Sequence, residues 1–181
     1  EAALKDHHGI VANPNCSTIQ MVMALEPVRR NFGLKQIVVS TYQAASGAGQ
    51  SALNEMYQEA QDFLDGKDMQ ADAHILPTKG DKKHYPLAFN LLPQIDVLEE
   101  SGYSHEEWKM IPETKKIMLG NMNSQDIKVT ATCVRVPVPI AHGESVYFTV
   151  EDESATAQDI MRVVADFPGN VLEDDIAHQI Y

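Results

Sequence analysis

Apolar residues recur every three or four positions in several stretches of the chain, and β-branched residues cluster in others. The first spacing is typical of amphipathic helices, and the second composition is typical of strands. The predicted helices cover about Ser17–Asn31, Gln50–Asp65, Glu106–Leu119 and Thr156–Phe167. The predicted strands cover Gln36–Tyr42, Ile127–Val138 and Val146–Val150. Prolines and turn residues interrupt residues 66–95, where we expect short strands and irregular excursions.

The order of these elements favours one fold class. Helices and strands are mixed along the chain, and a short link through His142 and Gly143 predicts that the last two strands are antiparallel neighbours. We therefore expect an α+β fold, in which a mixed, largely antiparallel sheet has helices on one face, rather than a doubly wound parallel sheet. No stretch has the composition of an interdomain linker, so residues 1–181 are interpreted as one domain.

The composition narrows the range of partners and compartments. With 14 basic and 26 acidic residues the formal charge is −12, which argues against nonspecific binding to nucleic acid or to an anionic membrane. No apolar run approaches the roughly 18–20 residues that span a bilayer. Two cysteines are too few for a disulfide framework and suit a reducing, cytoplasmic location. The loop Gly47–Gly49 lacks the third glycine and the acidic partner of a dinucleotide fingerprint.

The position of Cys16 is the strongest chemical signal in the chain. The turn sequence Asn13-Pro14-Asn15 precedes it, and a predicted helix follows it, with Asn15 or Ser17 as the N-cap. Free N–H groups at a helix start favour a thiolate over a thiol, and the thiolate is the nucleophile. We therefore interpret Cys16 as a nucleophile rather than a packing residue. Cys133, in an alternating apolar strand, is predicted to be a core residue.

Residue patterns alone leave more than one role open for each candidate partner of Cys16. His142 stands out among seven histidines because it closes the end of a strand, where a turn can project its ring into a cleft. Arg135 interrupts that apolar strand, so it either binds a carboxylate or phosphate or lies at a solvated edge. The i,i+3 spacing of Glu113 and Lys116 favours a solvated ion pair. The cationic turn at residues 79–84 favours a solvated loop over an anion contact.

Taken together, four motifs resemble the aspartate-β-semialdehyde dehydrogenase family, with wording similar to its Gram-positive bacterial branch. The motifs are Asn13–Thr18, Ser40–Gly49, Glu113–Ile117 and Thr132–Pro137 with His142 beyond it. They follow one another in order across most of the chain. The resemblance implies a domain similar to the C-terminal domain of glyceraldehyde-3-phosphate dehydrogenase.

The resemblance also implies a set of catalytic roles. Cys16 would attack the aldehyde carbon of L-aspartate-4-semialdehyde, and the resulting thioester would be cleaved by phosphate to give 4-phospho-L-aspartate. His142 would be the acid/base, and Gln43 would orient the substrate and the thioester. Asn15 would help to hold the oxyanion or phosphate.

Binding roles are implied for five further residues. Arg135 would bind the substrate α-carboxylate, Glu113 the α-ammonium group and Lys116 the phosphate. Ser46 and Gly47 would line the edge of the NADP(H) site. No metal is implied.

Members of this family also carry an N-terminal nucleotide-binding domain and a C-terminal segment that this sequence does not include. We therefore expect residues 1–181 to be the catalytic and dimerisation domain, inactive by itself, from a homodimer with a tetramer as the alternative. Two other functions remain open at this point. One is a related acyl-phosphate reductase, such as the N-acetylglutamyl-phosphate type, and the other is a non-catalytic dimerisation domain.

Overall fold

The computed structural model describes residues 5–180, so residues 1–4 and 181 of the predicted domain lie outside the described part. Its helices are α2 (Cys16–Phe32), α3 (Gln50–Leu64), α4 (His105–Leu119) and α5 (Ala157–Ala165). Its strands are β1 (Gln36–Gln43), β2 (Lys128–Arg135) and β3 (Gly143–Thr149). Short 3₁₀ turns are η1 (Ala45–Ala48), η2 (Met69–Asp72) and η3 (Ile176–His178). The four helices and three strands that were predicted by residue range form, with bounds that differ by a few residues.

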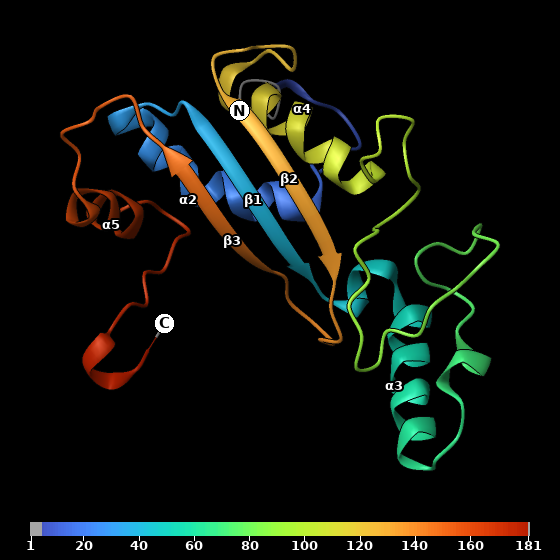
Figure 1. The fold of residues 1–181 in the computed structure, drawn as a ribbon. Coiled ribbons are helices and arrows are strands. Elements are labelled where there is room, and N and C mark those ends of the chain that lie inside the picture. The colour runs from blue at the N-terminus through green and yellow to red at the C-terminus, as the bar shows by residue number, and fades with distance from the viewer. Residues whose placement is uncertain (1–4, 181) are drawn as a thin grey trace.

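The strands form one mixed sheet in the order β2–β1–β3 (Figure 1). β1 pairs with β2 in parallel, from Gln36 opposite Lys128 to Gln43 opposite Arg135. β1 pairs with β3 in the antiparallel direction. The C-terminal ends of β1 and β2 therefore meet the N-terminal end of β3 at one end of the sheet.

The prediction that the last two strands are neighbours is wrong, because β1 lies between β2 and β3. The link that joins them contains prolines, which cannot donate backbone hydrogen bonds. Its carbonyls accept from η1 instead: Ala45 N donates to Val138 O at 2.8 Å, and Ser46 N donates to Pro139 O at 3.1 Å. These bonds hold the link across the end of β1, so the chain reaches the other edge of the sheet.

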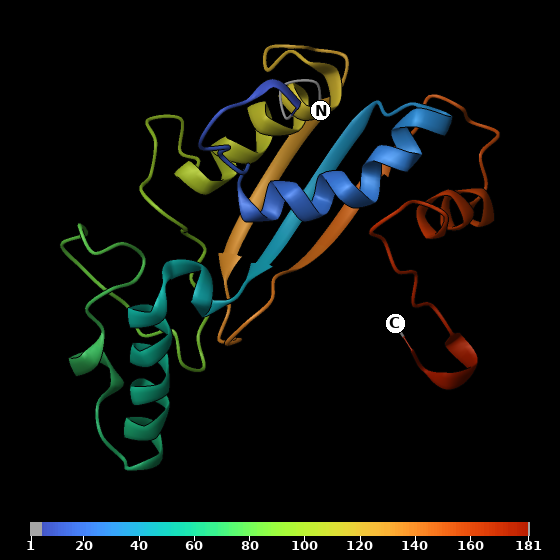
Figure 2. The same ribbon diagram turned by 180° about the vertical axis from the view of Figure 1, so that it is seen from behind.

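A long connection of residues 66–104, here called the strap, joins α3 to α4. The short strands expected within residues 66–95 do not form there, and the structure shows only η2 and an isolated bridge between Leu92 and Arg135. The prolines and turns of this segment leave no run long enough for a ladder. The strap runs from the end of α3 back along the molecule to α4 (Figures 1 and 2).

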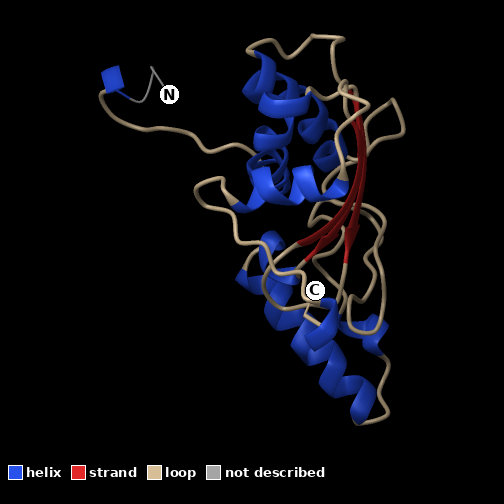
Figure 3. Cartoon of the chain, turned by 90° about the vertical axis from the view of Figure 1, so that its left-hand side faces the viewer, coloured by secondary structure: helices blue, strands red, loops and turns tan. Residues whose placement is uncertain are grey.

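The helices that cover the sheet lie on one face of it, as predicted (Figure 3). α4 packs on β2, and α2 packs between α4 and α5. The opposite face presents alternate side chains, of which Tyr42 and Tyr147 are exposed. The helices carry polar as well as apolar faces, and none in residues 5–180 is long and apolar enough to cross a membrane.

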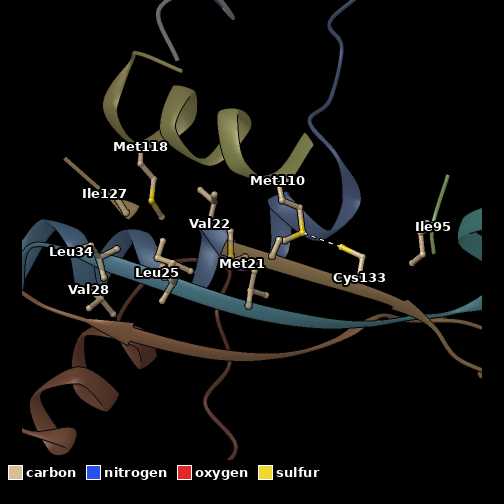
Figure 4. Close-up of a cluster of buried hydrophobic side chains, with 13 residues drawn as sticks. Met21, Val22, Leu25, Val28, Leu34, Ile95, Met110, Met118, Ile127 and Cys133 are labelled. Carbon is tan, nitrogen blue, oxygen red and sulfur yellow. Dashed lines mark hydrogen bonds between the residues drawn. The ribbon is translucent and has the colours of Figure 1, made fainter. Parts of the chain in front are cut away.

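The main core lies between α2, α4 and the covered face of the sheet (Figure 4). α2 and α4 contribute Met21, Val22, Leu25, Val28, Met110 and Met118 to it. The thiol of Cys133, on β2, lies 3.6 Å from the sulfur of Met110. Burial raises the pKa of Cys133 to about 12, so this thiol stays protonated. The prediction that Cys133 is a core residue is confirmed.

A carboxyl group is buried at one side of this core. Glu144, on β3, lines a cavity of about 330 Å³ between α2 and α5 whose other walls are mostly apolar. Its Oε1 atom is buried and has no hydrogen-bond partner within residues 5–180. Burial raises the pKa of Glu144 to about 7, although a hydrogen bond from Gln20 opposes the shift.

The stability of the fold is therefore expected to fall as pH rises from 4.5 to about 7, the interval between the ordinary and the folded pKa of Glu144. The folded state holds this proton more tightly than the unfolded chain, so raising the pH favours unfolding. Glu144→Gln stays neutral, and we expect it to be more stable than the wild type at pH 8 by about 1 kcal/mol, a value reduced for partial exposure. Thermal unfolding at pH 8 and pH 4.5 measures this difference, and equal shifts at both pH values would contradict it.

Candidate active site

Cys16 is the first residue of α2, and its side chain is exposed and free. Asn15 is the N-cap, as one of the two predicted candidates: its Oδ1 accepts from Ser17 N at 3.0 Å and from Thr18 N at 3.1 Å. The N–H of Cys16 itself donates to no acceptor in the described part of the chain. The thiol and a free backbone donor therefore lie together at the positive end of a 17-residue helix.

His142 lies against this cysteine, with Nε2 3.3 Å from Cys16 Sγ. Its other ring nitrogen, Nδ1, accepts a hydrogen bond from Ala44 N at 3.0 Å. A backbone N–H can only donate, so the proton of the neutral ring is on Nε2 and faces the sulfur. Burial, followed by the charge of Arg135, lowers the pKa of His142. Both effects favour a neutral ring, whose Nε2–H points at the Cys16 sulfur.

The turn that presents His142 is strained at one residue. Ala141 has a φ of 75°, a left-handed conformation that non-glycine residues rarely adopt. Such conformations cluster where the surrounding structure holds a functional side chain in place. The neighbouring link is held by η1, so the position of the His142 ring is set by the end of β1.

A buried carboxylate collects two amide side chains beside Cys16. Glu106, in the first turn of α4, is 6% exposed. Its Oε1 accepts from Asn15 Nδ2 at 2.7 Å and from Gln43 Nε2 at 3.1 Å. Its Oε2 lies 3.8 Å from Lys109 Nζ. This network fixes the side chains of Asn15 and Gln43, both of which were predicted to be catalytic, around one negative charge.

Arg135, the last residue of β2, is a buried cation without a carboxylate partner. It is 5% exposed, and its Nη1 donates to Ala44 O at 2.8 Å. No carboxylate within residues 5–180 forms an ion pair with it, and its buried Nε has no acceptor. Burial lowers the pKa of Arg135, but a guanidinium remains charged at physiological pH. Part of its hydrogen-bonding fork is thus available for an anionic ligand.

These groups border one cavity of about 390 Å³ at the end of the sheet where β1 and β2 terminate. Its walls include Asn15, Cys16, Gln43, Glu106, Lys109 and Arg135. The strap closes another side with residues 75–79 and 95–96. Within residues 5–180 no group of His, Cys, Asp and Glu side chains is placed to hold a metal ion. The cavity therefore offers a nucleophile, a carboxylate and cations to a small polar molecule.

Gly47, in η1, lines this cavity, and a side chain at this position would collide with Arg135 and His142. A Cβ atom at this position would be 2.9 Å from Arg135 Nη1 and 3.1 Å from His142 Cε1. Ser46 precedes Gly47 in η1, and its backbone is held by the link after β2. Glycine is needed at position 47 because of this close approach rather than because of its backbone angles.

Gly47→Ala is therefore expected to lower kcat/KM of the complete enzyme by about 100-fold, because a misplacement near 1 Å has this effect on aligned reacting groups. The fold should persist, since Gly47 is exposed and alanine suits its backbone. Steady-state kinetics and the thermal midpoint measure the two effects. Gly49→Ala is the comparison for backbone strain, because Gly49 has a φ of 93° and no atom within 4 Å of its Cβ position. Unchanged kinetics in Gly47→Ala would contradict the close packing.

The structure does not bring Glu113 and Lys116 to the cavity. Glu113 Oε2 accepts from Asn15 N at 2.9 Å, so this side chain supports the turn before Cys16. Lys116 lies exposed in the last turn of α4. Glu106 and Lys109, earlier in the same helix, line the cavity where Glu113 and Lys116 were expected.

A signal for Glu106 and Lys109 was present in the sequence. The helix contains two Glu-x-x-Lys pairs seven residues apart, and such pairs share one helix face. The first pair lies at the start of the helix, the second at its end. Only the packing of the N-terminus of α4 beside Asn15 and Gln43 distinguishes them.

Comparisons with known proteins identify the family of this chain. Residues 25–181 match the family described as semialdehyde dehydrogenase, dimerisation domain. The chain is 51% identical over its whole length to the aspartate-semialdehyde dehydrogenase of Bacillus subtilis (strain 168), of which it covers 51%. It is 43% identical to the enzyme of the same name from Aquifex aeolicus (strain VF5), over 96% of this chain and 47% of that protein. The chain thus spans about half the length of these curated relatives.

A solved structure shows the same architecture. It is the crystal structure of aspartate semialdehyde dehydrogenase II complexed with ASA from Vibrio cholerae, with a TM-score of 0.75 and 37% identity, over 88% of this chain and 44% of that one. The predicted α+β fold class is confirmed by this match and by the sheet and helix layer described above. With a family match that covers most of the sequence, the chain belongs to the semialdehyde dehydrogenase dimerisation-domain family.

Proposed function

We propose that this chain is the catalytic and dimerisation domain of an aspartate-semialdehyde dehydrogenase. The complete enzyme would interconvert L-aspartate-4-semialdehyde and 4-phospho-L-aspartate with NADP(H) and phosphate, in the biosynthesis of lysine, threonine and methionine. One observation carries the proposal: a single cavity is lined by Cys16, whose sulfur contacts His142, and by Arg135, whose guanidinium has no carboxylate partner within residues 5–180. A thiolate captures an aldehyde covalently, and a free guanidinium fork suits an α-carboxylate. The names of the curated relatives support the same reaction.

The proposed chemistry begins with attack of the Cys16 thiolate on the aldehyde carbon. The C–S bond forms, and the carbonyl π electrons move to oxygen. The N–H of Cys16 and the Nε2–H of His142 are donors near that oxyanion. A hydride then leaves the same carbon and a thioester forms. A phosphate oxygen attacks the thioester, Cys16 leaves as thiolate, and the phosphate proton passes to solvent.

Substrate recognition is proposed to depend on charges fixed around the cavity. Arg135 would bind the α-carboxylate, and Glu106 would accept the α-ammonium group in place of Glu113. Lys109 would face the phosphate in place of Lys116, although Asp96 Oδ2 at 3.2 Å already shares its charge. The side chain of Asn15 is used in capping α2 and in binding Glu106, so its contribution is to hold that carboxylate in position. Gln43 would keep its free amide oxygen for the substrate.

NADP(H) would supply the hydride acceptor or donor. Of its site this chain would offer η1, where Gly47 lies against His142 and Ser46 precedes it. Because Gly47 has no side chain, this wall of the site would leave room for the ring of the bound cofactor. The nucleotide-binding domain that the family resemblance implies would hold the rest of the cofactor.

We also propose that the enzyme is a homodimer, as the family description indicates. The sheet face opposite the helices supports this proposal, because it exposes aromatic side chains such as Tyr42 and Tyr147. Exposed apolar patches of this kind often mark surfaces through which proteins associate.

The test follows the reduction of NADP⁺ by the complete enzyme with L-aspartate-4-semialdehyde, with and without phosphate. Turnover that requires phosphate would support the proposed reaction. Turnover only with an N-acetylated glutamate semialdehyde would indicate the related acyl-phosphate reductase. A folded dimer that binds NADP⁺ but turns over neither aldehyde would overturn the catalytic proposal.

A further inference from the structure

The strap forms one wall of the catalytic cavity although it has almost no regular structure. Its residues 75–79 border the cavity that Cys16 also lines. The 3₁₀ turn η2 is the only helix of any kind in residues 66–104. A wall of this sort needs other interactions to hold its backbone at a fixed distance from the nucleophile.

Two carboxylates of α3 provide such interactions. Glu55 accepts two consecutive backbone N–H groups at the start of the wall: His74 N donates to Oε2 and Ile75 N to Oε1, both at 3.0 Å. One turn further along α3, Glu59 accepts Leu87 N at 2.8 Å and Ala88 N at 3.0 Å, both on Oε2. α3 thus holds the outgoing and the returning arm of the strap.

The burial of Glu59 strengthens this interpretation. Its side chain is 1% exposed and has no basic partner within residues 5–180, so the two backbone N–H groups are its main compensation for desolvation. Between the arms, Tyr85 N donates to Leu76 O at 3.0 Å. The returning arm then pairs with Arg135 through Leu92, N to O in both directions at 3.0 and 2.9 Å. The strap is therefore connected at one end to α3 and at the other to the cavity arginine.

We propose that Glu55 is a positioning residue for catalysis: by binding the N–H groups of His74 and Ile75 it sets the cavity wall of residues 75–79. Glu59 anchors the returning arm in the same way. This inference rests on the proposed function for its kinetic part only. The wall borders the cavity proposed to hold substrate and phosphate, whereas Cys16 and His142 are held by α2 and the end of β1. Loss of the anchor should therefore weaken binding and leave the chemical step nearly intact.

The two carboxylates use their oxygens differently, and this difference yields a sharp test. Glu55 uses one oxygen for each N–H, so Glu55→Gln must turn its NH₂ group toward one backbone donor and lose that bond. Glu59 uses a single oxygen for both N–H groups, so Glu59→Gln can keep both. We expect Glu55→Gln to raise the KM for semialdehyde or phosphate about tenfold, with kcat within about threefold. Glu59→Gln should change KM less than Glu55→Gln.

The experiment uses the complete enzyme and reads out hydrogen exchange as well as kinetics. In Glu55→Gln, the amides of residues 74 and 75 should exchange faster while those of β1 and α2 stay protected. Asp65→Asn is the matched control, because it removes a carboxylate at the end of the same helix. Within residues 5–180 the side chains that donate hydrogen bonds to this carboxylate are only Lys67 and Gln61. Glu55→Ala, which removes both acceptors, should show the larger effect of the same kind.

The outcomes distinguish this inference from the proposed function. Faster exchange at residues 74 and 75 with a KM effect and little kcat effect supports it. Unchanged exchange, or faster exchange without any kinetic effect, overturns it, as does a fall in kcat that follows a general loss of stability. A wild-type enzyme without phosphate-dependent turnover overturns the proposed function, and the exchange of residues 74 and 75 then still tests the anchor.

Discussion

Replacing Cys16 with alanine is expected to reduce phosphate-dependent turnover of the complete enzyme by about 10⁴-fold or more, the scale found when a covalent nucleophile is removed. The reason is that Cys16 forms the C–S bond of the proposed thioester and then leaves from it, and no other thiol lines the cavity in residues 5–180. The fold should persist, because the side chain is exposed and Asn15 rather than Cys16 caps α2. Steady-state kinetics with semialdehyde, NADP⁺ and phosphate measure the loss of turnover.

The matched control is Cys133→Ala, which removes the other cysteine. It creates a small cavity beside Met110, so we expect a stability loss of about 1–2 kcal/mol with turnover retained. A Cys16→Ala enzyme that keeps its turnover would refute the nucleophile assignment and with it the proposed mechanism. Loss of turnover in Cys133→Ala but not in Cys16→Ala would place the chemistry elsewhere.

Arg135→Met is expected to separate binding from stability. The substitution removes the guanidinium proposed to hold the α-carboxylate, so the KM for semialdehyde should rise by about 100-fold. The same change removes a buried charge without a carboxylate partner, so the thermal midpoint should not fall. Kinetics and thermal unfolding of the same preparation provide both values.

Arg135→Lys tests the geometry of the fork. Lysine keeps the charge but loses the planar donor set, and we expect most of the loss in binding to remain. A full rescue by lysine would show that charge alone is sufficient. A large fall in the thermal midpoint of Arg135→Met would show instead that Arg135 has a structural role.

The sequence identified those parts of the site that depend on local structure. The placement of Cys16 follows from a capped helix start, which the turn before it encodes locally. The contact of His142 with Cys16 is non-local; the residue pattern offered His142 only as a candidate, and the motif resemblance gave it a role. The equally non-local contact of Gln43 with Glu106 was not predicted. Their catalytic roles stay predictions until the variants above are measured.

The failures have physical causes as well. Two equivalent Glu-x-x-Lys pairs on α4 cannot be ranked without knowing which helix end meets the sheet. The wrong neighbour assignment of β2 and β3 arose because link length was used alone. The hydrogen bonds of that link to η1, which determine where the chain goes next, have no local sequence signature. The path of the strap could not be predicted either, because carboxylates of α3 hold its backbone in place.

The parallel pairing of β1 and β2 has a consequence for the nascent chain. Cys16 and His142 are 126 positions apart, and β1 and β2, whose parallel pairing helps to bring them together, lie between them. Closing so long a loop costs entropy before any contact repays it, so the pair forms only as the sheet is completed. During synthesis and folding the proposed nucleophile therefore lacks its histidine partner. Any reactivity that depends on this contact is acquired only with the native topology, so incomplete chains are less exposed to alkylation and oxidation at Cys16.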